Sequence, residues 1–403
     1  MKKNHNKRIY NFAIFICFIL IADIFLSGCV TEEIEPYQKK LTCEILDESL
    51  ELGTQFLINN QKPEGNFNYE YNWSNKSMSL DDNEVRQAGV LWGVALIYNE
   101  NPSDTLFNVL KKGFSFFKNY STESEDGRRW VIYPDDDMGN TGTVALLSLA
   151  IIDFLRSSGN IDAEYREELE NDLDKYLNFL ISVRLENFLF HETYYLKNGT
   201  GYGNPSPYFD GESLLALTKA AKYLDKDELK PIILETANAT YHYIVEPELY
   251  YKTDSPITKG FFQWGCMSYF ELATSDWEET ENYSDILIDL ADWMIDVHHT
   301  LKRTRNTGYA YEGIIHAYKI ALDAGDEDHI EKFTSVIDEG LYKLTSWQVE
   351  GPIPNAYLHN HSTNDTLAIG GIMNHKEEPP LRIDVTQHQM HAVILARKYV
   401  YGC

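Results

Sequence analysis

The chain is poor in cysteine and in basic residues. Its 403 residues include 5 Cys, and 35 Lys and Arg stand against 62 Asp and Glu, which gives a net charge of −27. No two cysteines have the CxxC spacing of a zinc ligand pair. Because a strongly negative chain repels phosphate backbones and anionic lipid headgroups, we exclude nucleic acid as a partner. We also expect no metal and no cofactor.

Long strand-like runs are missing as well. The chain has no extended valine-rich alternation, so strands should be few and confined to loops. Three cysteines, Cys43, Cys266 and Cys403, remain in the predicted folded part, and we expect no disulfide framework among them. These absences favour an all-α domain.

The first 29 residues have the pattern of a lipoprotein signal peptide. A basic start over 1–8 precedes an apolar stretch over 9–26, and the small pair Ser27-Gly28 stands before Cys29. This pattern predicts a signal peptide over 1–28, a lipidated Cys29 with a polar tether over 29–43, and one domain over 44–403. An uncleaved membrane anchor is the alternative, because the apolar stretch approaches spanning length. Both place the domain outside the cytoplasm, held at the cell membrane.

Two kinds of segment alternate six times along the domain. In the first kind, a loop rich in Gly, Asp, Asn or aromatic residues runs into a helix of small and apolar residues, which is typical of a helix buried on all sides. The second kind is charged and has apolar residues at steps of three and four, which predicts amphipathic helices with one solvent-exposed face. The first kind covers 83–98, 139–155, 209–224, 262–273, 308–322 and 382–399, and the second covers 44–60, 104–119, 162–184, 227–245, 281–300 and 328–347.

This alternation predicts an (α/α)6 toroid. Each helical hairpin has an apolar face that it cannot bury alone, and closing the hairpins into a ring buries these faces between neighbours. An open helical solenoid is the alternative, because the repeats differ in length. In a closed ring, the loops that lead into the inner helices gather at one end of a central cavity, so polar residues at these entrances should converge.

The last entrance carries the strongest candidate for chemistry. Asp384 and His388 are four residues apart and lie on one helical face, with Arg382 at the helix entrance. A carboxylate beside an imidazole can orient the ring and raise its basicity, which suits a general base. A purely structural pair is the alternative.

Other entrances supply further candidates. We expect Asp137, Glu212 and Glu312 to include a catalytic acid, although carboxylates also simply suit helix N-termini. Arg86 needs an acidic partner or an anionic ligand, and Gln87 follows it. Aromatic and amide groups that could hold sugar rings stand at Tyr208, Gln263, Trp264 and Tyr309.

The segment 351–380 should form a lid over the cavity. Its histidines His359, His361 and His375, together with His388 and His391, match no standard set of metal ligands.

The pattern resembles the six-hairpin toroid family of carbohydrate-active enzymes, over about residues 44–400. Arg382-Ile383-Asp384 followed by His388 is also similar to a segment of glucuronyl C5-epimerase catalytic domains. The resemblance implies an enzyme that acts on a saccharide, as a glycoside hydrolase, a polysaccharide lyase or an epimerase. With the signal pattern, it predicts a membrane-tethered, extracytoplasmic enzyme that acts on a surface saccharide. In the lyase and epimerase cases, Arg86 or Arg382 would bind a uronic carboxylate. The alternative is a noncatalytic lipoprotein that binds a glycan or a protein partner.

Overall fold

The computed structural model describes residues 40–134 and 137–403. The predicted signal peptide, Cys29, most of the tether, and Asp135 and Asp136 lie outside these residues. The compact unit runs from Leu41 to Cys403, where Leu41 is buried and the Thr42 side chain caps the first helix. Within the described residues, every helix is too short or too polar to cross a membrane.

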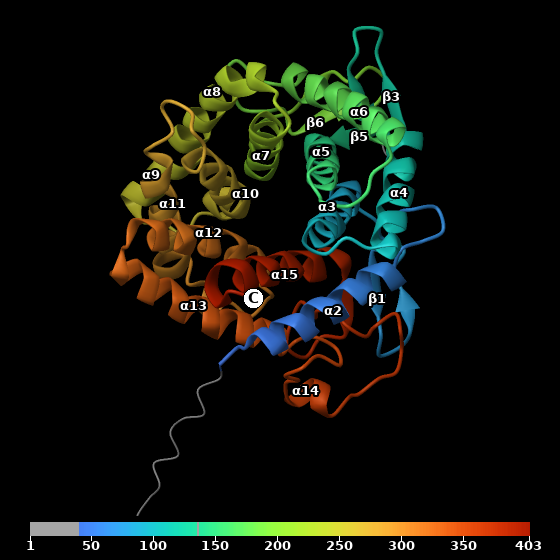
Figure 1. Ribbon diagram of the computed structural model, residues 1–403, viewed down its shortest axis with the longest axis vertical. Coiled ribbons are helices and arrows are strands. Elements are labelled where there is room, and N and C mark those ends of the chain that lie inside the picture. Colours follow the sequence, from blue (N-terminus) through green and yellow to red (C-terminus); the bar gives the residue numbers. More distant parts are fainter. Residues whose placement is uncertain (1–39, 135–136) are drawn as a thin grey trace, which may run out of the picture. The chain divides into compact units, whose positions relative to one another are not determined.

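In the part of the chain that the structure describes, twelve main helices form a closed double ring (Figure 1). The inner helices are α3 (Glu84–Glu100), α5 (Thr141–Leu155), α7 (Pro207–Tyr223), α10 (Pro256–Ala273), α12 (Gly308–Ala324) and α15 (Ile383–Ala396). The outer helices are α2 (Cys43–Asn59), α4 (Asp104–Asn119), α6 (Ala163–Ser182), α8 (Lys230–Thr240), α11 (Tyr283–Asp292) and α13 (Glu327–Thr345). Since the last inner helix packs on the first, the ring is closed, and the predicted (α/α)6 toroid is confirmed.

Seven short helical segments complete the loops. They are η1 (Asp227–Leu229), η2 (Tyr241–Val245), α9 (Glu246–Tyr251), η3 (Trp293–Val297), η4 (Thr300–Lys302), α14 (Ala356–His359) and η5 (Arg397–Tyr401).

Burial separates the two rings as the sequence pattern predicts. Every residue of α5 is buried, because helices contact it on all sides. The outer helix α13 instead buries Phe333, Ile337, Leu341 and Leu344, which recur at steps of three and four on one face. The inner ring therefore forms the wall of the cavity, and the outer ring shields it from water.

The strands are short and lie in loops, as expected. Three small antiparallel sheets are formed by β1 (Glu70–Asn72), β2 (Ser77–Met78) and β8 (Pro380–Arg382); by β3 (Ser121–Glu123) and β4 (Arg129–Val131); and by β5 (Met138–Asn140), β6 (Thr193–Tyr195) and β7 (Gly201–Tyr202). Strands β5 and β8 run directly into α5 and α15. Pairing of Asn140 with Thr193, and of Arg382 with Glu70, fixes the entrances of these two inner helices.

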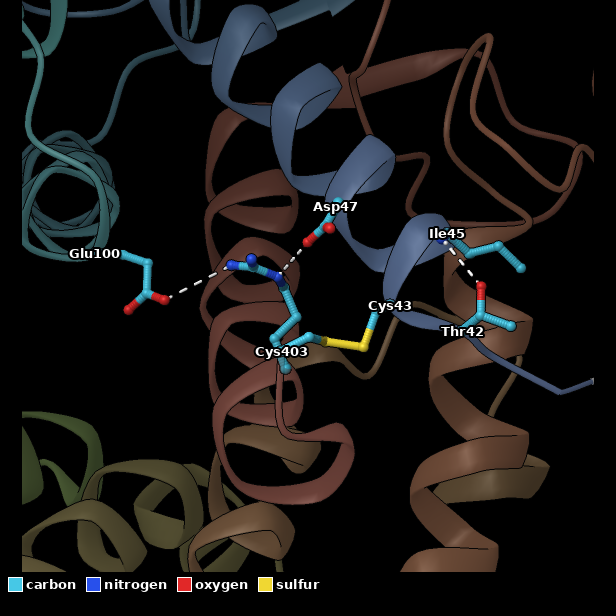
Figure 2. Close-up of a disulfide and its surroundings, with 7 residues drawn as sticks. Thr42, Cys43, Ile45, Asp47, Glu100 and Cys403 are labelled. Atoms are coloured by element: carbon cyan, nitrogen blue, oxygen red, sulfur yellow. Dashed lines mark hydrogen bonds and ion pairs between the residues drawn. A yellow bond between two sulfur atoms is a disulfide. The ribbon is translucent and has the colours of Figure 1, made fainter.

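A disulfide corrects one expectation from the sequence. Cys43, the first residue of α2, is bonded to Cys403, with 6.0 Å between the Cα atoms (Figure 2). The bond joins residues 360 positions apart, so their spacing in the sequence gave no sign of it. Beside it, Arg397 Nε lies 2.6 Å from Asp47 Oδ1. The first and last hairpins are thus joined covalently and by an ion pair. Cys266 is buried and free.

The segment 351–380, expected to form a lid, lies partly against the first outer helix and partly at the cavity. Asn59 Nδ2 donates to the carbonyl of Thr366 at 2.8 Å, and Asn60 Nδ2 donates to that of Leu367 at 3.1 Å. Asn374 lines the cavity, its carbonyl accepts the N–H of Asn306 at 2.8 Å, and Glu378 pairs with the lining Arg305. A role as a lid stays a prediction.

Candidate active site

A cavity of about 610 Å³ lies where the inner helices begin. Residues at or near the first turns of all six inner helices line it, so the predicted convergence of the entrances is confirmed. Nine of the twelve residues proposed from sequence for catalysis or binding are in the lining: Arg86, Tyr208, Glu212, Gln263, Trp264, Tyr309, Arg382, Asp384 and His388.

The other three proposed residues lie elsewhere. Asp137 is exposed and outside the lining. Gln87 is buried and holds a loop, because its amide bonds both backbone groups of Phe67 and a side-chain oxygen of Asp82. Glu312 is buried directly behind His388. Asp137 and Gln87 are therefore not part of the site that we describe, whereas Glu312 acts on it through His388.

Asp384 is held by two guanidinium groups. Arg382 donates from Nε at 2.6 Å and from a terminal nitrogen at 2.9 Å, and Arg86 Nε lies 3.2 Å from the second oxygen. Burial alone would lower the pKa of Arg382, but the bonds and charge of Asp384 raise it above the usual value. Asp384 is thus held by three contacts with two guanidinium groups.

His388 takes its carboxylate partner from a different helix than the sequence suggested. Its Nδ1 lies 3.1 Å from Oε1 of Glu312 in α12, which is fully buried. Burial alone would lower the pKa of His388, but the charge of Glu312 and its hydrogen bond, together with the charge of Asp384, raise it. The expected orienting role of Asp384 is therefore filled by Glu312. His388 lines the cavity, and the raised pKa favours its protonated form.

A second histidine on the cavity was missed by the sequence reasoning. His298 Nδ1 lies 2.7 Å from Oδ1 of Asp254, and its Nε2 lies 3.5 Å from the hydroxyl of Tyr309. Burial lowers the pKa of His298, which favours the neutral ring. An Arg303 guanidinium nitrogen also lies 3.0 Å from Nδ1, and in the tautomer that donates Nδ1–H to Asp254 the lone pair is on Nε2. His298 is therefore suited to accept a proton.

The sequence gave little warning of His298. It lies in a loop that we assigned to an outer helix, and its partner Asp254 is 44 residues away. The only local signal was the basic stretch Lys302-Arg303-Thr304-Arg305 just before the fifth inner helix, which is unusual in so acidic a chain. Arg303 and Arg305 line the cavity too.

Glu212 is a buried acid at the edge of the cavity. Its side chain is fully buried, and its Oε2 has no hydrogen-bond partner. Burial raises its pKa well above the usual value, which favours the protonated carboxyl. Gly142 leaves room for it, because a Cβ there would lie 2.3 Å from Oε2. Glu212 can therefore donate a proton or a hydrogen bond to a ligand oxygen.

Its neighbour Asp210 also has a raised pKa, at about 8, through burial, and it accepts the backbone N–H of Phe190. Asp210 therefore supports the loop and is outside the cavity lining. No cluster of three or more His, Cys, Asp or Glu side chains in the described part of the chain is arranged to hold a metal ion.

Comparisons with known proteins identify the fold. No protein-family model and no curated protein matches this chain. Among solved structures, a cellobiose 2-epimerase from Bacillus thermoamylovorans is 11% identical with a TM-score of 0.61, covering 87% of this chain and 98% of its own. A D-mannose isomerase is 13% identical with a TM-score of 0.59, covering 90% and 99%. An unsaturated glucuronyl hydrolase specific for heparin is 13% identical with a TM-score of 0.59, covering 88% and 97%.

These structures share the (α/α)6 toroid over nearly their whole length. The resemblance to six-hairpin toroid carbohydrate-active enzymes is therefore confirmed.

Proposed function

We propose that the chain is a saccharide isomerase or epimerase, which moves a proton at the carbon beside a sugar carbonyl. The observation that carries this proposal is the pair of cavity histidines, each bonded through Nδ1 to a carboxylate and with pKa values moved in opposite directions. One imidazole is suited to be a base and the other an acid, as enolisation requires. Neighbours of the same fold include an epimerase and an isomerase.

The reaction follows from these two roles. His298 Nε2 takes the proton from the carbon next to the carbonyl of the open-chain sugar, while His388 gives its Nε2 proton to the carbonyl oxygen, so that an enediol forms. The isomer forms when His298 returns its proton to the former carbonyl carbon and His388 takes the proton of the other enediol hydroxyl. The epimer forms when water on the opposite face gives a proton to the original carbon, His388 takes back the carbonyl proton, and His298 passes its proton to the hydroxide that remains. Trp264 packs against His388 with 6.0 Å between ring centroids and provides an apolar surface for the sugar ring.

Hydrolysis is supported less well by the same cavity. A glycosidase needs one protonated and one free carboxyl group on the two sides of the scissile bond. The lining carboxyls are Glu212 and Asp384, and Asp384 is held by two arginines. A noncatalytic binding module is supported still less, because an open aromatic platform would have no need of two carboxylate-bound histidines.

Solvent exchange tests the proposed reaction. In D2O, we expect the protein to replace the hydrogen at the carbon beside the carbonyl of a reducing sugar with deuterium, which proton NMR detects as loss of that signal. Because exchange reports the proton abstraction itself, it does not depend on knowing the product. New reducing ends without deuterium would favour a hydrolase, and binding without either change would favour the noncatalytic alternative.

We also propose that the protein is a lipoprotein held outside the cytoplasm through Cys29. The Cys43–Cys403 disulfide supports this location, because disulfides persist in oxidising compartments and are rare in the cytosol. We expect mass spectrometry of the protein from cells to find an N-terminal peptide that starts at Cys29 and carries a diacylglycerol. Cys29→Ser should keep residues 1–28. An intact peptide over 1–29 in the unaltered protein would instead establish the uncleaved anchor.

A further inference from the structure

The cavity carries more positive charge than its carboxylates neutralise, although the chain as a whole is strongly acidic. Six basic side chains line it: Arg86, Lys259, Arg303, Arg305, Arg382 and His388. Four carboxylates, Asp384, Asp254, Glu378 and Glu312, pair with five of them and leave Lys259 over. Burial raises the pKa of Glu212, the lining carboxyl outside these pairs, and so disfavours a negative charge there. A chain of net charge −27 that keeps its cavity positive is suited to an anionic ligand.

Lys259 is the lining cation that has no carboxylate partner among the described residues. It is half-buried in the first turn of α10, and its ammonium lies 4.8 Å from the ring centroid of Tyr309 and 5.8 Å from that of Tyr208. Its Nζ lies 3.5 Å from the Tyr208 hydroxyl. The two aromatic faces hold the ammonium in place and stabilise its charge without neutralising it.

The helix ends around Lys259 add to the positive potential. Thr307 and Gly308, at the start of α12, line the cavity; Thr307 makes no side-chain cap bond, and the Gly308 N–H donates to Asn306 Oδ1 at 2.8 Å. Backbone N–H groups at such an end favour an anion. The amides of Asn306 and Asn374 also line this wall and can complete the hydrogen bonding of a ligand.

We propose that the saccharide substrate carries an anionic group, a carboxylate or a sulfate, and that Lys259 binds this group between Tyr208 and Tyr309. This inference rests on the proposed function for the reaction, and it adds the class of substrate. Because Tyr309 contacts both Lys259 and His298, the anionic group is placed on the side of the cavity where the neutral histidine lies. Lys259 is therefore a specificity-determining residue for acidic sugars.

Matched sugars and variants test this proposal. Exchange in D2O is measured with glucose, glucuronic acid and glucose 6-sulfate, for the unaltered protein and for Lys259→Met and Lys259→Arg. We expect the acidic sugars to be preferred, and Lys259→Met to lower their kcat/KM by about 10- to 100-fold through KM, since a charge-assisted hydrogen bond is lost. Glucose should lose less than the acidic sugars do, and a change shared by all three sugars reports the effect of the Lys259 charge on the pKa of His298. Lys259→Arg should retain most of the preference, as expected for a contact that depends on charge. Whichever acidic sugar is preferred identifies the anion.

Lys230→Met is the matched control for removing a lysine that lies over an aromatic ring. Its ammonium lies 5.0 Å from the ring centroid of Trp277, outside the cavity lining, so its kinetics should be unchanged. A preference for glucose, or an unchanged preference in Lys259→Met, would overturn the substrate class and leave the reaction standing. If no sugar exchanges hydrogen in D2O, the proposed reaction is refuted, and calorimetry then tests the anion site by itself. Binding of acidic sugars that is lost in Lys259→Met supports the anion site. No binding of acidic sugars to the unaltered protein refutes it.

Discussion

Replacing His388 with glutamine is expected to lower kcat for deuterium exchange by about 10²- to 10⁴-fold, the usual contribution of a general acid or base. Glutamine keeps a hydrogen-bonding group of similar size but cannot give a proton to the sugar carbonyl. KM should change little, because the imidazole acts mainly in the transition state. Initial rates of exchange under saturating sugar measure the effect, and thermal unfolding verifies that the variant is folded.

His391→Gln provides the matched control. His391 Nδ1 lies 3.3 Å from the same Glu312 oxygen, but His391 does not line the cavity. Its replacement should lower kcat by less than about tenfold, since it removes a neighbour of Glu312 and not a group that meets substrate. Equal losses in the two variants would mean that both histidines only support the fold, and an active His388→Gln protein would remove His388 from the mechanism.

Glu312→Gln distinguishes positioning from direct catalysis. The charge of Glu312 raises the pKa of His388, so a neutral amide should lower it. The acid form of His388 is then lost at lower pH, and the alkaline limb of the pH profile of kcat should move to lower pH. A structural role alone would reduce the rate without moving this limb.

The ring itself could be predicted from the sequence because it depends on local composition. An inner helix must be apolar on all sides, as α5 is, and an outer helix needs one solvent-exposed polar face, as α13 has. These two patterns are readable within a single segment, and their alternation determines the architecture. The polar loops before the inner helices were predictable for the same reason. Polar residues at the start of a buried helix need hydrogen-bond partners or a cavity that holds solvent or ligand.

The partners inside the cavity could not be predicted in this way. Helical spacing put Asp384 and His388 on one face, but it says nothing about which side chains arrive from other helices. Asp384 pairs with Arg86, and His388 pairs with Glu312, which is 76 residues away in sequence. The same limit hid the pair of His298 with Asp254. Such contacts depend on how hairpins pack around the ring, and no single segment encodes them.

Removing Asp153 is expected to lower the free energy of unfolding by roughly 3–5 kcal/mol, the usual cost of breaking a buried ion pair. Asp153 is fully buried in α5 and accepts hydrogen bonds from Lys219 Nζ of α7, at 2.6 and 2.7 Å, and from Trp92 Nε1 of α3, at 2.7 Å. Arg156 donates at 2.8 Å. Asp153→Ala leaves the Lys219 ammonium buried without its partner, and urea unfolding measures the loss.

Two further variants make the origin of this loss testable. In Asp153→Leu combined with Lys219→Met, both charges are gone, so the loss should be clearly smaller than the sum of the single losses. Asp323→Ala removes an exposed pair with Lys319 and should cost less than about 1 kcal/mol. A loss below about 1 kcal/mol in Asp153→Ala would show that this network does not hold the inner ring together.

Acid should reproduce the effect of removing Asp153. Burial alone would raise its pKa, but the charges of Lys219 and Arg156 lower it below the usual value. A carboxylate with a depressed pKa contributes its full stability above the unfolded pKa, about 3.9, and loses it as the pH falls through the folded pKa. Between neutral pH and strong acid, unaltered protein should therefore lose more stability than the Leu–Met double variant. The network lies at the end of α5 that is far from the cavity entrance. This loss of stability in acid therefore comes from protonation of Asp153 in the inner ring and not from the histidines that act on the sugar.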